Sequence, residues 1–113
     1  MAYLRKWAGQ NMLQIGDGYI KEWSGKILYK IDESYVREFS GKILYKIDTD
    51  TIRDFYGRIV LRVVQNQVKE FSGRVLYKID GNYIREFSGM IVYQIDGFIS
   101  RRELMALIAV LFG

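Results

Sequence analysis

The sequence predicts an all-β fold built from tandem β-hairpins, with one short C-terminal α-helix after them. Three observations lead to this prediction: a repeat of sixteen residues, a glycine at one fixed position of every repeat, and short segments rich in β-branched and aromatic residues on both sides of that glycine. Segments of this length and composition are typical of strands rather than helices. Each repeat is therefore expected to form a strand, a glycine turn, a second strand and a polar turn.

Six units cover residues 3 to 98 without insertion or deletion. The similarity is clearest between YIKEWSGKILYKIDES and the sixteen residues after it, YVREFSGKILYKIDTD. The units are 3–18, 19–34, 35–50, 51–66, 67–82 and 83–98. The sequence thus predicts a hairpin-repeat domain over residues 1–98 and an apolar helix within 99–113.

The first turn of each unit contains the fixed glycine, with an aromatic residue two positions before it. The turn glycines are Gly9, Gly25, Gly41, Gly57, Gly73 and Gly89. In Glu38-Phe39-Ser40-Gly41 an acid stands at turn position i and glycine at i+3. This spacing favours a type I turn closed by a left-handed glycine, the three-residue hairpin with a G1 bulge. A two-residue Ser-Gly turn is the alternative, and polar pairs such as Gln65-Asn66 predict the second turn.

The choice of turn decides which side chains share a face, because a shift of one residue exchanges the two faces of a strand. With the G1 bulge, one face of the third unit is predicted to carry Tyr35, Arg37, Phe39, Ile43, Tyr45 and Ile47. The other face is predicted to carry Val36, Glu38, Lys42, Leu44 and Lys46.

A single hairpin is marginally stable in water, so neighbouring units must complete the burial of its apolar face. Twelve short strands can close into a ring or barrel, which removes the sheet edges, or stay open and need caps. The sequence leaves both possibilities open. Unit one is atypical, with Asn11 and Gln14, and the junction of units three and four has Thr51 and Val64 at unusual positions. These departures indicate an end, a seam or a binding spot.

The tail begins with a capping box, in which Ser100 is the N-cap and Glu103 the N3 residue. The helix after it is apolar on all sides, so we expect it to be buried. It can cover or fill the β assembly, pack against a second copy of the chain, or lie on a membrane surface. For self-association the expected contact residues are Leu104, Leu107, Ile108 and Leu111.

Catalytic and metal chemistry finds little support in the composition. The chain has no histidine and no cysteine, which excludes His- or Cys-based zinc sites, cysteine nucleophiles and Ser-His-Asp triads. Acids that recur in nearly every unit are better explained as turn and surface residues, because active sites are usually single and asymmetric. Asp48-Thr49-Asp50 lacks the glycine and distal glutamate of an EF-hand loop. We therefore expect no enzyme, no cofactor and no metal site.

Recurrent tyrosines are the candidate ligand-binding residues. They are Tyr29, Tyr45, Tyr77 and Tyr93, and lysines follow most of them. Aromatic rings beside cations can stack on sugars or nucleotide bases. The alternative is core packing with the hydroxyl group reaching the surface.

The repeat [YTQ]-[ILV]-[RK]-[ED]-[FW]-[SY]-G-[KRM]-[IV]-[LV]-[YL], at a step of sixteen, resembles the bacterial β-flower proteins. The resemblance covers residues 3–98 and implies Gly-turned hairpins that radiate like petals about a pseudo-symmetry axis. It implies no activity, because that family is functionally uncharacterised. Two features depart from it: the flower typically has four hairpins rather than six units, and the apolar tail has no counterpart. Near-identical units such as KILYKID at 26–32 and 42–48 fit recent duplication or design equally well.

The sequence therefore favours a non-enzymatic structural or protein-interaction module that forms homo-oligomers through its C-terminal helix. The alternative is a carbohydrate- or nucleic-acid-binding repeat domain that uses exposed rows of tyrosine and lysine. A net charge of +4 permits weak binding of polyanions. The sequence contains no run of eighteen apolar residues, so it predicts no transmembrane helix, and we expect a cytoplasmic location.

Overall fold

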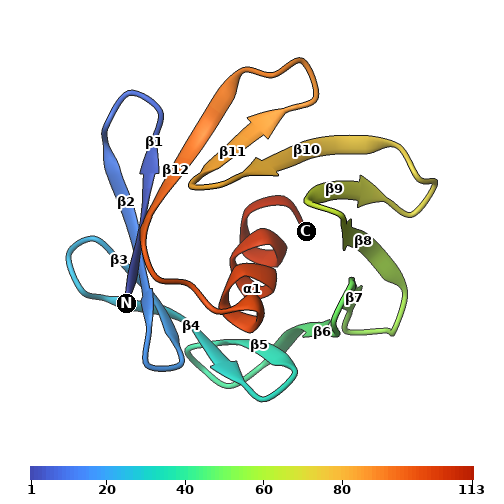
Figure 1. The fold of residues 1–113 in the computed structure, drawn as a ribbon. Helices are drawn as coiled ribbons and strands as arrows, with labels where there is room; N and C mark the ends of the chain where they lie inside the picture. Colours follow the sequence, from blue (N-terminus) through green and yellow to red (C-terminus); the bar gives the residue numbers. More distant parts are fainter.

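The computed structural model describes residues 1–113 as twelve strands and one helix. The strands are β1 (Ala2–Lys6), β2 (Asn11–Gly16), β3 (Tyr19–Glu22), β4 (Ile27–Asp32), β5 (Tyr35–Glu38), β6 (Ile43–Ile47), β7 (Thr51–Asp54), β8 (Ile59–Val64), β9 (Gln67–Glu70), β10 (Val75–Asp80), β11 (Tyr83–Glu86) and β12 (Ile91–Gly97), and the helix is α1 (Arg101–Phe112). Six hairpins, numbered 1 to 6 along the chain, radiate around α1, which lies in the middle of the ring (Figure 1). The predicted fold class is confirmed.

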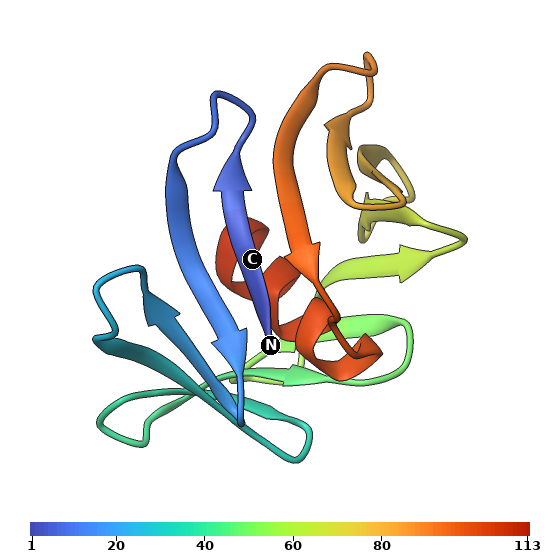
Figure 2. The same ribbon diagram turned by 60° about the vertical axis from the view of Figure 1, so that its left-hand side comes forward.

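The ring is closed. Every strand pairs antiparallel with its neighbours in the sequence, and β1 also pairs with β12, where Leu4 lies opposite Ile95. Closure leaves no strand edge unpaired, which decides between the two arrangements that the sequence left open. The molecule is a flattened body of 37 × 33 × 18 Å, with the hairpins splayed outward in both views (Figures 1 and 2).

Each hairpin tip is the three-residue turn with a G1 bulge. The glycine N–H donates to the carbonyl three residues earlier in all six tips, as Gly41 does to Glu38 at 2.9 Å. The φ angles of these six glycines lie between +88° and +101°, a region that side chains disfavour. The two-residue Ser-Gly alternative is therefore excluded. The second turns have two residues, and Gln65 and Asn66 both adopt positive φ, as a type I′ turn requires.

The predicted division of faces is wrong beyond the tip, because each hairpin contains a second bulge. In hairpin 3, Arg37 faces Ile43 as expected, but Val36 faces Tyr45, so Leu44 has no partner. Val36 and Tyr45 therefore share the inner face, although the prediction placed them on opposite faces. The same register shift occurs in all six hairpins.

The core is formed where one hairpin meets the next. At each junction one aliphatic residue of a second strand lies opposite one of the following first strand. The six pairs are Ile15–Ile20, Ile31–Val36, Ile47–Ile52, Val63–Val68, Ile79–Ile84 and Ile95–Leu4. All of these side chains except the half-buried Ile79 are buried, and they form one cluster with Met105–Ala109 of α1.

The N-terminus of α1 is capped and tied to the ring. The backbone N–H of Glu103 donates to Ser100 Oγ at 3.2 Å, and the Glu103 carboxylate accepts from the Ser100 N–H at 3.0 Å, which confirms the capping box. Arg101 Nη2 donates to the carbonyls of Thr49 and Val63 at 3.1 and 2.9 Å. At twelve residues α1 falls short of the length and apolar character that a membrane-crossing helix needs, and it is the one helix of the structure.

The structure places part of the expected oligomer interface inside the protomer. Leu107 and Ile108 are 0% exposed and contact the ring's own aliphatic residues. They are therefore buried within the protomer, and association of copies through α1 stays a prediction. The cause is ring closure, which creates an opening that α1 fills. Leu104 and Leu111 are half-buried and keep some exposed surface.

We predict that Leu107→Ala destabilises the whole ring. The loss of buried methyl groups and the cavity left behind cost about 2–5 kcal/mol. Urea unfolding followed by far-UV circular dichroism measures this change. Phe98→Ala, at a residue that is 76% exposed, is the control and should leave the unfolding midpoint nearly unchanged. An unaltered midpoint for Leu107→Ala would contradict the central role of the helix.

Candidate functional site

Three hollows of the surface occupy equivalent places in the repeat. Each lies at a junction, between the second strand of one hairpin and the tip of the next, and we name them grooves 2/3, 3/4 and 5/6 after the hairpins they separate. Groove 2/3 is lined by 26–29, 38–40 and Leu44; groove 3/4 by Tyr29, 42–45, 54–56, Arg58 and Val110; and groove 5/6 by 74–77, 86–88, Leu111 and Phe112.

The grooves share four kinds of side chain because the register repeats. A tyrosine of the second strand lies opposite an acid of the next hairpin in the pairs Tyr29–Glu38, Tyr45–Asp54 and Tyr77–Glu86. A tip phenylalanine follows each acid, and a basic residue begins each second-strand segment. The tip residues are Phe39, Phe55 and Phe87, and the basic residues are Lys26, Lys42 and Arg74.

The other three junctions lack one part of this combination. Leu13 faces Glu22 and Leu61 faces Glu70, so the acid is present without a tyrosine. Tyr93 faces Lys6, so the tyrosine is present without an acid. The pairing of tyrosine with acid thus occurs at three junctions, and these are the junctions of the three grooves.

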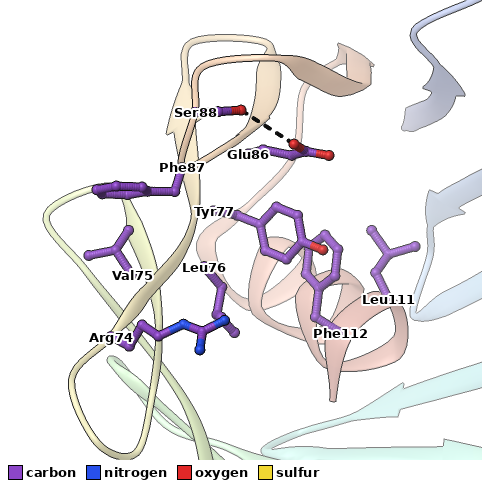
Figure 3. Close-up of a pocket in the computed structure, with 9 residues that line it drawn as sticks. All are labelled: Arg74, Val75, Leu76, Tyr77, Glu86, Phe87, Ser88, Leu111 and Phe112. Carbon is purple, nitrogen blue, oxygen red and sulfur yellow. Dashed lines mark hydrogen bonds between the residues drawn. The ribbon is translucent and has the colours of Figure 1, made fainter.

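Groove 5/6 has a volume of about 920 Å³ and an apolar floor made by α1 (Figure 3). The ring of Phe112 stacks on Tyr77, with centroids 4.0 Å apart and planes at 19°, which fixes the tyrosine. Ser88 Oγ donates to Glu86 Oε2 at 3.3 Å. Glu86 Oε1 accepts no hydrogen bond within the chain, so it remains free for a ligand donor.

Groove 2/3, of about 380 Å³, repeats this arrangement. Ser40 Oγ donates to Glu38 Oε2 at 3.2 Å, and again Oε1 accepts nothing within the chain. Leu28 and Leu44 form an apolar wall beside Tyr29. Grooves 2/3 and 5/6 therefore present the same chemistry: an apolar surface, a tyrosine and one free carboxylate oxygen.

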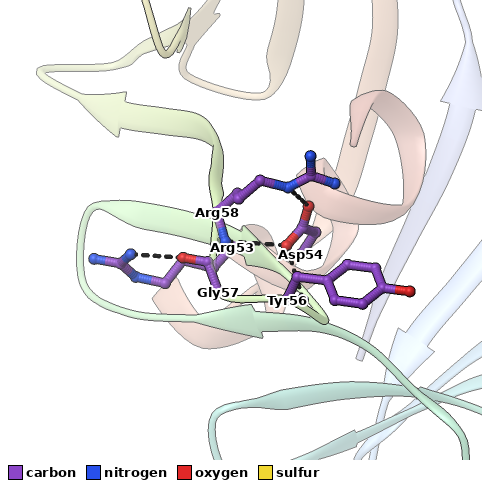
Figure 4. Close-up of polar contacts among 5 residues, drawn as sticks. All are labelled: Arg53, Asp54, Tyr56, Gly57 and Arg58. Atoms are coloured by element: carbon purple, nitrogen blue, oxygen red, sulfur yellow. Dashed lines mark hydrogen bonds and ion pairs between the residues drawn. The ribbon is translucent and has the colours of Figure 1, made fainter.

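Groove 3/4 differs because its acid is occupied (Figure 4). Asp54 Oδ1 accepts from the backbone N–H groups of Tyr56 at 2.9 Å and Arg58 at 3.0 Å, and Oδ2 accepts from Arg58 Nε at 3.0 Å. Desolvation raises the pKa of Asp54, but these hydrogen bonds and the Arg58 charge outweigh it and lower the pKa below its ordinary value. Burial, with the nearby Tyr29 and Asp54, raises the pKa of the Tyr45 hydroxyl.

The structure places the predicted tyrosines partly as expected. Tyr29, Tyr45 and Tyr77 are half-buried against the core and line grooves, so core packing and ligand access coexist in one side chain. The ring centroid of Tyr93 lies 6.2 Å from that of Phe112, and Tyr93 lines none of the three grooves. Tyr29 and Lys30 are consecutive in a strand and point to opposite faces, whereas Lys78 Nζ lies 5.3 Å over the ring of Phe87, which lines groove 5/6 together with Tyr77.

The acids of the grooves were not singled out as ligand-binding residues from the sequence. Glu38 and Glu86 resemble Glu70, which has the same serine contact, from Ser72 at 3.2 Å. Only the strand register shows that Glu38 and Glu86 face a tyrosine, whereas Glu70 faces Leu61.

Metal-binding side chains do not gather in the structure: no group of three or more Asp or Glu residues is placed to hold an ion. In the acidic segment singled out above, Asp48 lies 3.7 Å from Arg53, and Asp50 lies 3.7 Å from Arg101. Both carboxylates are thus paired with cations.

Comparison of the chain with protein-family models, with curated proteins and with solved structures gives no match. Function must therefore be inferred from the grooves themselves.

We predict that the hydrogen bonds of Asp54 make part of the stability depend on pH. Because its pKa is lowered in the folded state, the carboxylate stabilises the fold above the ordinary carboxyl pKa of about 4, and this contribution is lost as the pH falls through the folded-state pKa. Asp54→Asn should therefore be less stable than the parent chain at pH 7, with a smaller difference at pH 3. Urea unfolding at both values measures this, and a constant difference would refute it.

Proposed function

We propose that the chain is a non-enzymatic binding module that presents repeated ligand sites between its hairpins. One observation carries the proposal: a groove of the same construction recurs at three junctions of the ring. Active sites are usually single and asymmetric, whereas equivalent sites repeated around a scaffold suit multivalent binding.

The exposed aromatics support the same proposal. The tip residues Phe39, Phe55 and Phe87 are among the most exposed large apolar side chains of the molecule. Covering an exposed aromatic ring with a ligand removes apolar surface from water, which lowers the free energy. Exposed apolar groups beside polar ones are typical of ligand and partner sites.

We predict that small probes bind in the grooves rather than elsewhere. The probes are a set of neutral oligosaccharides, a twenty-nucleotide single-stranded DNA at low salt, and a mixture of short peptides. Titration of isotope-labelled protein followed by NMR should move the backbone amide signals around Tyr29 and Tyr77, because grooves 2/3 and 5/6 share the pairing of a tyrosine with a glutamate. If no probe moves these signals, the binding-module proposal is wrong.

Association of copies through α1 remains a prediction, restricted to its half-buried residues Leu104 and Leu111. Light scattering of the full chain should give a mass above that of the monomer. Leu104→Gln should return it to the monomer while far-UV circular dichroism stays the same. A monomeric parent chain would refute self-association without affecting the proposal about the grooves.

Three finer points also stay proposals from the sequence: membership of the bacterial β-flower group, a cytoplasmic location and weak binding of polyanions. The observed ring of tandem hairpins supports the first, because petals around an axis are what the resemblance implies.

A further inference from the structure

We propose that grooves 2/3 and 5/6 each bind a residue of a neutral oligosaccharide, which makes the chain a bivalent carbohydrate-binding domain. This inference rests on the proposed function and adds the class of ligand. It follows from what the two grooves offer: an exposed phenylalanine ring, a free carboxylate oxygen and a tyrosine beside apolar side chains.

The aromatic face comes first. Phe39 and Phe87 are 73% and 64% exposed and project from the hairpin tips at the rim of their grooves. A sugar ring has an apolar face of C–H groups and an edge of hydroxyl groups. The C–H face of one sugar residue can cover the phenylalanine ring, which removes apolar surface from water without burying a polar group.

The polar partners of the groove match the hydroxyl edge. Oε1 of Glu38 and of Glu86 accepts no hydrogen bond within the chain, while the serine on Oε2 holds the carboxylate in place. An ionised carboxylate only accepts, so it pairs with donors such as sugar hydroxyls, and such charge-assisted bonds are short and strong. The hydroxyls of Tyr29 and Tyr77 can both donate and accept.

The paired charges of the groove linings favour a neutral ligand over a nucleic acid. The lining of each groove holds one acid and one base, Glu38 with Lys26 and Glu86 with Arg74, and at groove 5/6 Lys78 Nζ also lies 5.3 Å over the Phe87 ring. The Arg74 guanidinium also lies 3.7 Å from Glu70, which further reduces the attraction for an anion. A phosphate in groove 2/3 would meet the Glu38 carboxylate, and like charges repel.

Groove 3/4 provides a contrast within the same molecule. Its acid, Asp54, already accepts three hydrogen bonds from Tyr56 and Arg58, so no carboxylate oxygen is free for a sugar. We therefore expect two sites per chain rather than three.

The test is calorimetric titration of the full chain with neutral trisaccharides of β-1,4-linked glucose, β-1,4-linked N-acetylglucosamine and α-linked mannose. At least one should bind with two sites per chain. Glu38→Gln and Glu86→Gln should each reduce the stoichiometry to one, and the double variant should lower the affinity at least tenfold. Phe39→Ala and Phe87→Ala should have the same effect.

The chain offers matched controls for both changes. Glu70→Gln removes an acid with the same serine contact that faces Leu61, and Phe71→Ala removes a tip ring that is 68% exposed at a junction without a tyrosine. Neither control should alter binding. Sugar binding that the groove variants leave unchanged, or that the controls abolish, would overturn the inference.

The other probes separate this inference from the broader proposal. If the DNA or the peptides bind in these grooves and no sugar does, the carbohydrate inference is wrong and the binding module stands. If no probe of any class binds there, both are wrong.

Discussion

The whole structure depends on the aliphatic pairs that join each hairpin to the next. A sixteen-residue hairpin cannot bury its own inner face, so each junction contributes two side chains to a common centre. Six such junctions close only if β1 pairs with β12, and closure leaves an opening that α1 fills with Met105–Ala109. The positions of the strands, the helix and the grooves all follow from this constraint.

Local features of the fold could be predicted because their chemistry is local. The glycine turn, the two-residue polar turn and the capping box each depend on residues within a few positions of one another. The second bulge could not be predicted in this way. Leu44 is the residue that has no partner across the hairpin. An apolar residue is also expected at this position when it is paired, so the sequence does not reveal the bulge. The face assignment of Val36 failed for this reason, and the place of α1 depended on a closure that the sequence left undecided.

The groove residues, like the second bulge, could be predicted only in part from the sequence. The tyrosines stand out as recurrent large side chains, and three of the four line grooves. The acids do not stand out, because nearly every unit has one. What distinguishes Glu86 from Glu70 is the residue across the junction, Tyr77 in one case and Leu61 in the other. A repeat sequence hides such differences, since the partners are set by pairing between units rather than within them.

The order of the chain has a consequence for synthesis on the ribosome. All six hairpins are made before α1, and β1 must wait for β12 before the ring can close. Until then the inward aliphatic side chains have no central partner and remain open to other nascent chains or to chaperones. A translation product that stops before residue 101 would leave the inward aliphatic side chains exposed. Formation of α1 is therefore also the step that removes the surface to which chaperones bind.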